Sequence, residues 1–258
     1  MILDINEISF SYDGNRQIFE DISFSVKKGE IMSIIGKNGI GKSTLIKCLI
    51  NLYPVNTGFI KIMGQDIRSM SAKSLARIIG YVPQGHQTVF PFTALDFVTM
   101  GRSPHLSFLD SPGEKDVRIA EEAINKIGAE YLKDRPINEI SGGERQMLML
   151  ARALAQEAKV LILDEPTSHL DFGNQHKVLC AIEKLSKEGI AIVMSTHFPD
   201  HAFMLSSQVA IMQDKKFIAQ GDADDVITRQ NLKDAYGIDV AISHVGDAGR
   251  NVCVPLSF

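Results

Sequence analysis

The chain has 258 residues, of which 45% are hydrophobic and 22% are charged, and its formal net charge is −4. These proportions match ordinary globular proteins and exclude disorder, collagen and coiled coil as the main structure. The small negative charge supplies no bulk attraction to nucleic acid or anionic lipid, so we expect no nucleic-acid partner. Three widely spaced cysteines without a CxxC pair argue against a disulfide framework and a thiolate zinc site.

Neither a leader nor a membrane span is expected from the hydropathy pattern. The first residues carry acids where a signal peptide needs a basic start. The longest apolar runs, at residues 160–163 and 189–194, fall far short of the ~18 residues that a span requires. We therefore expect a soluble, cytosolic protein.

The first elements in chain order are strands. Alternating apolar and polar side chains over the first 30 residues predict short antiparallel strands, with a turn at Asp13-Gly14-Asn15. The apolar run Ile31–Ile35 is typical of a strand buried on both faces of a mainly parallel sheet. After Gly36, apolar residues at helical spacing predict a helix that begins near Lys42 and ends before Pro54.

The remaining elements suggest one core with an insertion. Further strands are predicted at residues 59–63, 78–82, 160–163, 190–195, 209–213 and 216–219. The stretch between Val82 and Val160 is mostly helical in pattern, with a capping box expected at Ser111 and Glu114. Because it is too long for a loop, we predict an inserted helical subdomain at residues 85–157. Residues 221–258 are expected to form a C-terminal helical extension, and residues 1–258 a single domain.

A phosphate-binding loop is the clearest motif. The pattern G-x-x-x-x-G-K-[ST] is matched between a predicted strand and helix by Gly36, Lys37, Asn38, Gly39, Ile40, Gly41, Lys42, Ser43 and Thr44. Glycines let backbone N–H groups approach phosphates, and a helix N-terminus adds unpaired donors. Lys42 would reach the β- and γ-phosphates, and the Ser43 hydroxyl would ligate magnesium. The alternative is a glycine-rich turn with a purely structural role.

Two carboxylates follow the apolar run at residues 160–163. Asp164 and Glu165 would emerge at the C-terminal end of a buried strand, where open α/β sheets bind ligands. Asp164 would hold magnesium, directly or through water, and Glu165 would act as the general base on an attacking water. The alternative is an ordinary strand end that turns at Pro166.

Ser141-Gly142-Gly143-Glu144 precedes a predicted helix with one apolar face. Two interpretations stay open. Ser141 and Glu144 fit a capping box, which needs no ligand. In the other interpretation, the N–H groups of Ser141 and the two glycines form a second anion site that faces a terminal phosphate.

These three segments, in this order, resemble the nucleotide-binding subunit of an ABC transporter over roughly residues 2–220. Residues 140–144 are similar to the family signature Leu-Ser-Gly-Gly-Gln, which other P-loop ATPases lack. The resemblance implies an α/β fold: a P-loop NTPase (RecA-like) core with an N-terminal antiparallel β-subdomain and an inserted helical subdomain. It also implies ATP and Mg²⁺ as cofactors.

The resemblance extends to single residues. Tyr12 is similar to the aromatic that stacks on adenine, and Gln84 to the Q-loop glutamine that contacts magnesium and the attacking water. Asp171 is similar to the D-loop aspartate, and His197 to the switch histidine. Strand packing for Tyr12 and a solvated turn for Gln84 remain alternatives. His197 and His201 have metal-ligand spacing, but no third ligand is apparent.

Two positions depart from the family signature. Ile140 replaces the usual Leu, and Glu144 replaces the usual Gln. Glu144 adds negative charge near a phosphate site unless Arg145 offsets it. We expect activity to survive, with an altered affinity for nucleotide.

A mechanism also follows from the resemblance. Two copies would pack head to tail as a homodimer, with ATP between residues 36–44 of one copy and 141–143 of the other. Hydrolysis would drive two polytopic permease subunits, which a substrate-binding protein serves indirectly. The chain would then lie peripherally on the cytoplasmic face of the inner membrane.

The cargo is suggested by residues 92–98 and 100–106. They are similar to subunits that import iron–siderophore complexes, haem or cobalamin, and molybdate or tungstate importers look alike. One alternative is a non-transport ABC ATPase acting on nucleic acid or ribosomes, although such proteins usually carry a coiled-coil insertion or tandem ATPase units. A small-molecule kinase would explain the phosphate loop but neither Ser141 nor Gln84.

Overall fold

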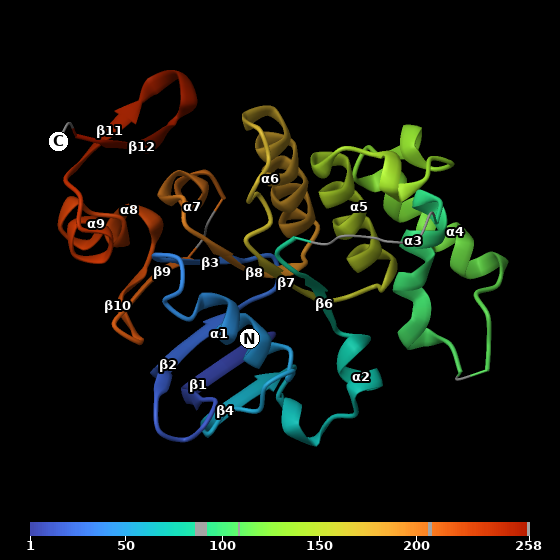
Figure 1. Cartoon of the computed structure of the whole chain (residues 1–258), viewed down its shortest axis with the longest axis horizontal. Coiled ribbons are helices and arrows are strands. Elements are labelled where there is room, and N and C mark those ends of the chain that lie inside the picture. Colours follow the sequence, from blue (N-terminus) through green and yellow to red (C-terminus); the bar gives the residue numbers. More distant parts are fainter. Residues whose placement is uncertain (86–91, 108, 206–207, 257–258) are drawn as a thin grey trace. The chain divides into compact units, whose positions relative to one another are not determined.

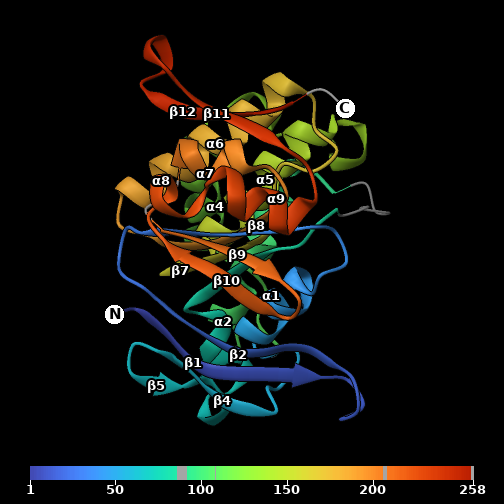
Figure 2. The same ribbon diagram turned by 90° about the vertical axis from the view of Figure 1, so that its left-hand side faces the viewer.

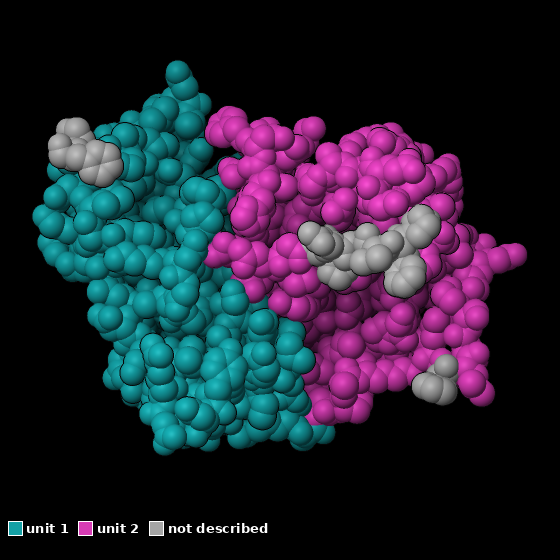
Figure 3. All heavy atoms as spheres, in the orientation of Figure 1, with its two compact units in different colours: residues 1–69, 191–258 teal, residues 70–190 magenta. Residues whose placement is uncertain are grey.

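The computed structural model of the chain describes residues 1–85, 92–107, 109–205 and 208–256. It contains two compact units, one of residues 1–69 with 191–258 and one of residues 70–190 (Figure 3). No helix in the described part of the chain combines the length and the hydrophobicity needed to cross a membrane.

The first unit begins with an antiparallel sheet (Figure 2). Its strands are β1 (Leu3–Ser11), β2 (Gln17–Val26), β4 (Thr57–Ile62) and β5 (Gln65–Asp66), in the order β2-β1-β4-β5. Ile5 of β1 pairs with Phe24 of β2 and Ile60 of β4, and all three side chains are buried. This register places one face of each strand in the core, as the alternating sequence pattern predicts.

The first unit also contains parallel strands. β3 (Ile31–Ile35) lies between β8 (Ala191–Thr196) and β9 (Gln208–Gln213) and is parallel to both. β10 (Lys216–Gly221) pairs antiparallel with β9. Every residue of β3 is buried, which explains its apolar sequence. Helices α1 (Lys42–Leu49) and α7 (Pro199–Leu205) follow β3 and β8 (Figure 1).

The end of the chain corrects one prediction. Helices α8 (Ala223–Val226) and α9 (Arg229–Tyr236) lie in the expected helical extension, residues 221–258. However, β11 (Val240–Val245) and β12 (Arg250–Pro255) then form an antiparallel hairpin, so the prediction of a helical tail is wrong for these residues. The physical reason is that β-branched residues recur along both segments and two glycines lie in the turn between them.

The second unit combines a parallel strand pair with helices. β6 (Ile79–Val82) pairs in parallel with β7 (Val160–Asp164). The helices are α2 (Ala72–Ala76), α3 (Ala94–Thr99), α4 (Glu114–Lys126), α5 (Gly142–Ala155) and α6 (Phe172–Lys187). Helices α3, α4 and α5 pack against one another within the stretch predicted as helical, residues 85–157. Its status as a separate subdomain stays a prediction.

Short 3-10 helices complete both units. They cover Ile67–Ser69, Met100–His105, Glu130–Leu132, Ile137–Glu139 and Gly246–Ala248. The start of α4 differs from the predicted capping box at Ser111 and Glu114. The N-cap is Gly113, whose N–H group donates to the Asp116 carboxylate at 3.1 Å.

Candidate functional site

The predicted phosphate loop connects β3 to α1 in the first unit. Gly36 directly follows β3, and Gly41, with φ +113°, is the N-cap of α1. A Cβ on Gly36 would lie 2.6 Å from the carbonyl oxygen of Met212, so only glycine lets the chain pass this point. Lys37, Asn38 and Gly39 are exposed, as an anion-binding loop requires.

Lys42 is 4% exposed at the first position of α1. Its Nζ donates to the carbonyl oxygens of Gly36 at 2.8 Å and Lys37 at 2.9 Å. These bonds hold the ammonium group across the loop and compensate for the desolvation of its charge. An aliphatic side chain at this position could not donate to either carbonyl group.

Tyr12 lies beside this loop, at the end of β1. Its hydroxyl shares a 3.1 Å hydrogen bond with Oγ1 of Thr44, and its ring packs edge-on against Phe10 and Tyr53. The residue is nevertheless 60% exposed. The structure therefore brings Tyr12 to the phosphate loop and leaves ring surface for a ligand. Tyr53 has no motif around it and was not identified from the sequence.

His197 follows β8 in the same unit. Its ring lies 4.0 Å from that of Phe198, centroid to centroid, and its carbonyl oxygen accepts a bond from Tyr236. The neighbouring His201 is buried, and burial, with smaller effects of His197 and Arg250, lowers its pKa to about 4. The His201 imidazole is consequently neutral at pH 7.

Asp164 ends the buried strand β7 in the second unit, and Glu165 directly follows it. They are 3% and 7% exposed. Glu165 has φ +46°, an uncommon conformation for a non-glycine residue that often marks a functional site. Burial, and then the Asp164 charge, raise the pKa of Tyr81 to about 12.

The structure brings Gln84 to this pair of carboxylates. Nε2 of Gln84 donates to Oε2 of Glu165 at 3.2 Å. The two residues are far apart in sequence, but β6 and β7 are neighbours, and Gln84 follows the first strand as Glu165 follows the second. An amide donor beside the carboxylate orients it without removing its charge.

Ser141 caps helix α5, and Glu144 completes the capping box. The Glu144 carboxylate accepts from the Ser141 N–H at 2.9 Å and from its hydroxyl at 2.8 Å. The Ser141 N–H bond, followed by the hydroxyl bond, lowers the pKa of Glu144. The capping interpretation is therefore confirmed. Gly142 and Gly143 occupy the first turn, where helical N–H groups have no acceptor within the helix.

Arg135, and not Arg145, faces the Glu144 carboxylate. Nη1 of Arg135 lies 4.0 Å from the Glu144 carboxylate, whereas Nη2 of Arg145 donates to the carbonyl oxygen of Ile140 at 3.4 Å. The condition left open for Arg145 is therefore not met by an ion pair with Glu144, and Arg135 lies near that carboxylate instead. No local sequence pattern marks Arg135, because its contact with Glu144 depends on how the 3-10 helices Glu130–Leu132 and Ile137–Glu139 fold before α5.

Asp171 is the N-cap of α6. Its carboxylate accepts from the backbone N–H of Asn174 at 2.8 Å and from its side-chain amide at 2.7 Å. Asn174 also explains Gly143, since a Cβ there would lie 2.4 Å from its Cγ. The starts of α5 and α6 are therefore in close contact, and Asp171 holds the Asn174 side chain between them.

The chain is similar to known proteins over most of its length. A family model described as "ABC transporter" matches residues 19–168. An iron(3+)-hydroxamate import ATP-binding protein of Bacillus subtilis is 34% identical, over 98% of this chain and 94% of the relative. A molybdate import ATP-binding protein of Haemophilus influenzae is 31% identical, over 89% and 86% of the two chains.

A solved structure gives a similar result. It is described as an inward-facing conformation of a metal-chelate type ABC transporter, and the match has a TM-score of 0.88 at 29% identity. The match covers 99% of this chain and 98% of the other. These likenesses confirm the predicted α/β fold with its P-loop core.

Proposed function

The chain belongs to the ABC transporter family and hydrolyses ATP as a subunit of a transporter, and from this premise we propose that it powers import of a metal chelate or metal oxyanion. The observation that carries the ATPase chemistry is the buried carboxylate Glu165 with the Gln84 amide on it. The cargo class is supported by relatives that import iron(3+)-hydroxamate and molybdate, and by the metal-chelate type structural neighbour.

ATP binding is assigned to the residues around the phosphate loop. N–H groups of residues 36–44 and the Lys42 ammonium would bind the phosphates, and the exposed ring of Tyr12 would stack on adenine. Ring exposure and the Thr44 hydrogen bond support that role for Tyr12. The missing Cβ at Gly36 supports a cradle built from main chain.

Magnesium fits the donor set predicted for it. Ser43, Asp164 and Gln84 supply a hydroxyl, a carboxylate and an amide oxygen, the hard ligands that Mg²⁺ prefers. Bound magnesium would neutralise charge on the β- and γ-phosphates. We assign its binding to these three residues.

Hydrolysis is assigned to Glu165, Gln84 and His197. Glu165 would accept a proton from the attacking water, and the Gln84 amide holds its carboxylate at 3.2 Å. His197 would contact the γ-phosphate. Its position directly after β8 supports this role, because ligands of α/β sheets gather at the carboxyl ends of strands.

We further propose a head-to-tail homodimer. Ser141, Gly142, Gly143 and Glu144 of one copy would face the ATP held by the other, and Asp171 would lie at the same interface. A two-fold dimer makes two such sites, since each surface patch meets its counterpart. ATP bridges the copies and therefore stabilises the closed dimer.

The transporter supplies the membrane part. We propose two polytopic permease subunits as partners, served by a substrate-binding protein, with this chain peripheral on the cytoplasmic face of the inner membrane. We propose that the permease contacts this chain after Gln84 and in the helical insertion. Residues 86–91 of that region lie outside the described residues.

Substitution Glu165→Gln tests the mechanism, because it keeps the shape of the side chain and removes the base. We expect ATP binding to persist, turnover to fall about 10²- to 10⁴-fold, and an ATP-bound dimer to accumulate. Glu183→Gln is the matched control, because Glu183 lies on α6 and its carboxylate forms an ion pair with Lys187. Wild-type hydrolysis by Glu165→Gln would refute the assignment. Uptake assays of the assembled transporter with iron chelates and molybdate test the cargo.

A further inference from the structure

The end of the chain contacts the segment that carries His197. Residues 229–255, called the C-terminal clamp below, comprise α9 and the β11–β12 hairpin, and β12 packs against α7 (Figure 2). The Tyr236 hydroxyl donates to the carbonyl oxygen of His197 at 3.4 Å. Nη1 of Arg250 donates to the carbonyl oxygen of Asp200 at 3.3 Å, and the Cys253 N–H donates to the Asp200 carboxylate at 2.8 Å.

An apolar cluster supports these hydrogen bonds. Leu232 and Ala235 of α9 are buried with Ala202 of α7 and with Ile35, the last residue before the phosphate loop. Ile242 and Cys253 of the hairpin pack on the same cluster. One core therefore joins the clamp, the helix after His197 and the strand that ends at Ile35. Because such interiors are closely packed, a displacement of one element is transmitted to the others.

The clamp also reaches the phosphate loop itself. Gly237 ends α9 with φ +73°, and a Cβ there would lie 3.8 Å from Nζ of Lys37. Tyr236 and Gly237 are consecutive, so one turn of chain lies beside the predicted γ-phosphate histidine and beside an exposed lysine of the loop.

We propose that the C-terminal clamp positions His197 for ATP hydrolysis, with Tyr236 and Arg250 as its positioning residues. This inference rests on the proposed role of His197. All three hydrogen bonds have their acceptors in residues 197–200, namely the carbonyl oxygens of His197 and Asp200 and the Asp200 carboxylate. They therefore fix the path of the backbone from which the His197 imidazole projects. The clamp thereby affects turnover without contacting nucleotide phosphate or the attacking water.

The test uses Tyr236→Phe and Arg250→Ala in the full chain. Each removes one hydrogen bond, and Tyr236→Phe keeps the ring in the core. We expect kcat for ATP to fall about five- to tenfold in each variant, the scale of one lost hydrogen bond, with KM within about twofold of wild type. Arg250→Lys retains a donor and should restore most of kcat.

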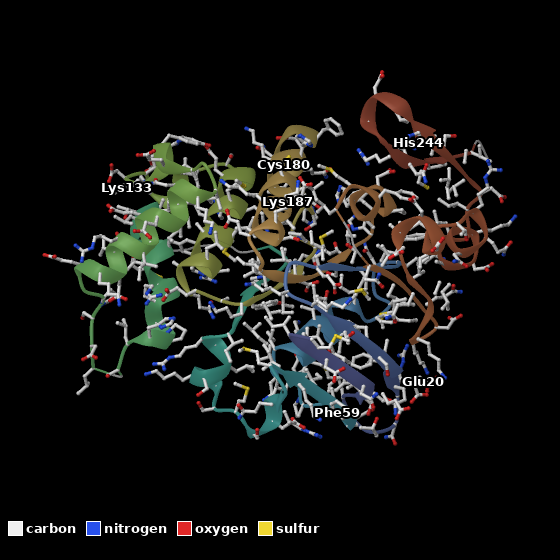
Figure 4. The ribbon with its side chains drawn as sticks, turned by 180° about the vertical axis from the view of Figure 1, so that it is seen from behind. Glu20, Phe59, Lys133, Cys180, Lys187 and His244 are labelled. Atoms are coloured by element: carbon white, nitrogen blue, oxygen red, sulfur yellow. The ribbon has the colours of Figure 1, made fainter. Side chains whose placement is uncertain are left out.

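Two substitutions on the same hairpin are controls. Asn251 donates to Asp224 of α8 at 2.7 Å, so Asn251→Ala loosens the hairpin elsewhere. His244 is exposed on β11 (Figure 4), so His244→Ala removes only an exposed side chain. Both controls should keep wild-type kcat. If Tyr236→Phe and Arg250→Ala also keep it, the proposal is overturned.

A second measurement separates the clamp from the role of His197. Hydrogen–deuterium exchange of residues 197–205 should speed up in Tyr236→Phe and Arg250→Ala, and stay unchanged in Asn251→Ala. Unchanged exchange in all variants overturns the clamp. If His197→Ala retains wild-type turnover, the proposed role of His197 fails instead. If both hold, Tyr236→Phe should slow the His197→Ala variant no further.

Discussion

Substitution of Gly36 by alanine tests how closely the phosphate loop is tied to its sheet. The added Cβ would lie 2.6 Å from the Met212 carbonyl oxygen at the end of β9, and 3.4 Å from Cγ2 of Ile40. The first contact is too short for any Cβ to tolerate, and its partner is backbone. Alanine therefore forces the ends of β3 and β9 apart.

The size of the effect follows from this geometry. Overpacking a closely packed site costs about 1–3 kcal/mol, and the clash with backbone places Gly36→Ala near the upper end. Gly64→Ala is the matched control, because Gly64 has φ +83° with no atom within 4 Å of its ideal Cβ position. That control carries only the backbone cost, about 1–2 kcal/mol.

Urea unfolding and nucleotide titration measure the two consequences. We expect the free energy of unfolding to fall by about 3 kcal/mol for Gly36→Ala, with unchanged m-value. ATP affinity should fall more than about tenfold, because the loop donors lose their arrangement, while Gly64→Ala binds ATP like wild type. If Gly36→Ala matched its control in both measurements, the close approach would have no energetic role.

Three further substitutions make separate predictions. Lys42→Ala should lower ATP affinity at least about tenfold, because it removes a charge-assisted donor; calorimetric titration showing unchanged affinity would contradict the assignment. Glu144→Gln removes a negative charge near the predicted phosphate site and should lower KM for ATP by up to about fivefold, while the cap on Ser141 largely persists; an unchanged or higher KM would count against that site. His201 has its pKa lowered to about 4, so its contribution to stability is complete above pH 6.5 and is lost as pH falls toward 4. His201→Gln should remove up to about 3 kcal/mol of this pH dependence in urea unfolding at pH 4–7, whereas exposed His244→Gln should leave it in place.

The sequence could predict elements whose hydrophobic period is set by burial on a sheet. Strands expected at residues 78–82, 160–163 and 190–195 are observed at Ile79–Val82, Val160–Asp164 and Ala191–Thr196. Both faces of β7 and β8 are covered, so long apolar runs mark them in any context. The phosphate loop was predictable for a different reason, since its G-x-x-x-x-G-K-[ST] pattern is local in sequence. The contact that excludes a Cβ at Gly36 comes from Met212 of β9 and is not local.

Features that depend on tertiary contacts were not predictable. The hairpin of residues 240–255 has a weak pattern, and its inner residues Ile242 and Cys253 are half-buried only because α7 and α9 supply the other side. Likewise, Arg135 faces Glu144 across a folded turn that no local pattern encodes. At the start of α4, Asp116 outcompetes the predicted Ser111 cap because its carboxylate reaches the Gly113 N–H and an ion pair with Arg102.

At the start of α5, the groups that form a structural cap are the same groups that we propose as a ligand site. Sequence alone left these interpretations as alternatives, but Ser141 gives both its N–H and its hydroxyl to Glu144. A terminal phosphate at this helix would then meet the N–H groups of Gly142 and Gly143 first, and would compete with Glu144 for the hydroxyl. A glutamine at this position would compete less, because it is neutral. We therefore expect the departure from the family signature to act on nucleotide affinity through Ser141, and we expect Arg135, whose Nη1 lies 4.0 Å from the carboxylate, to reduce the penalty.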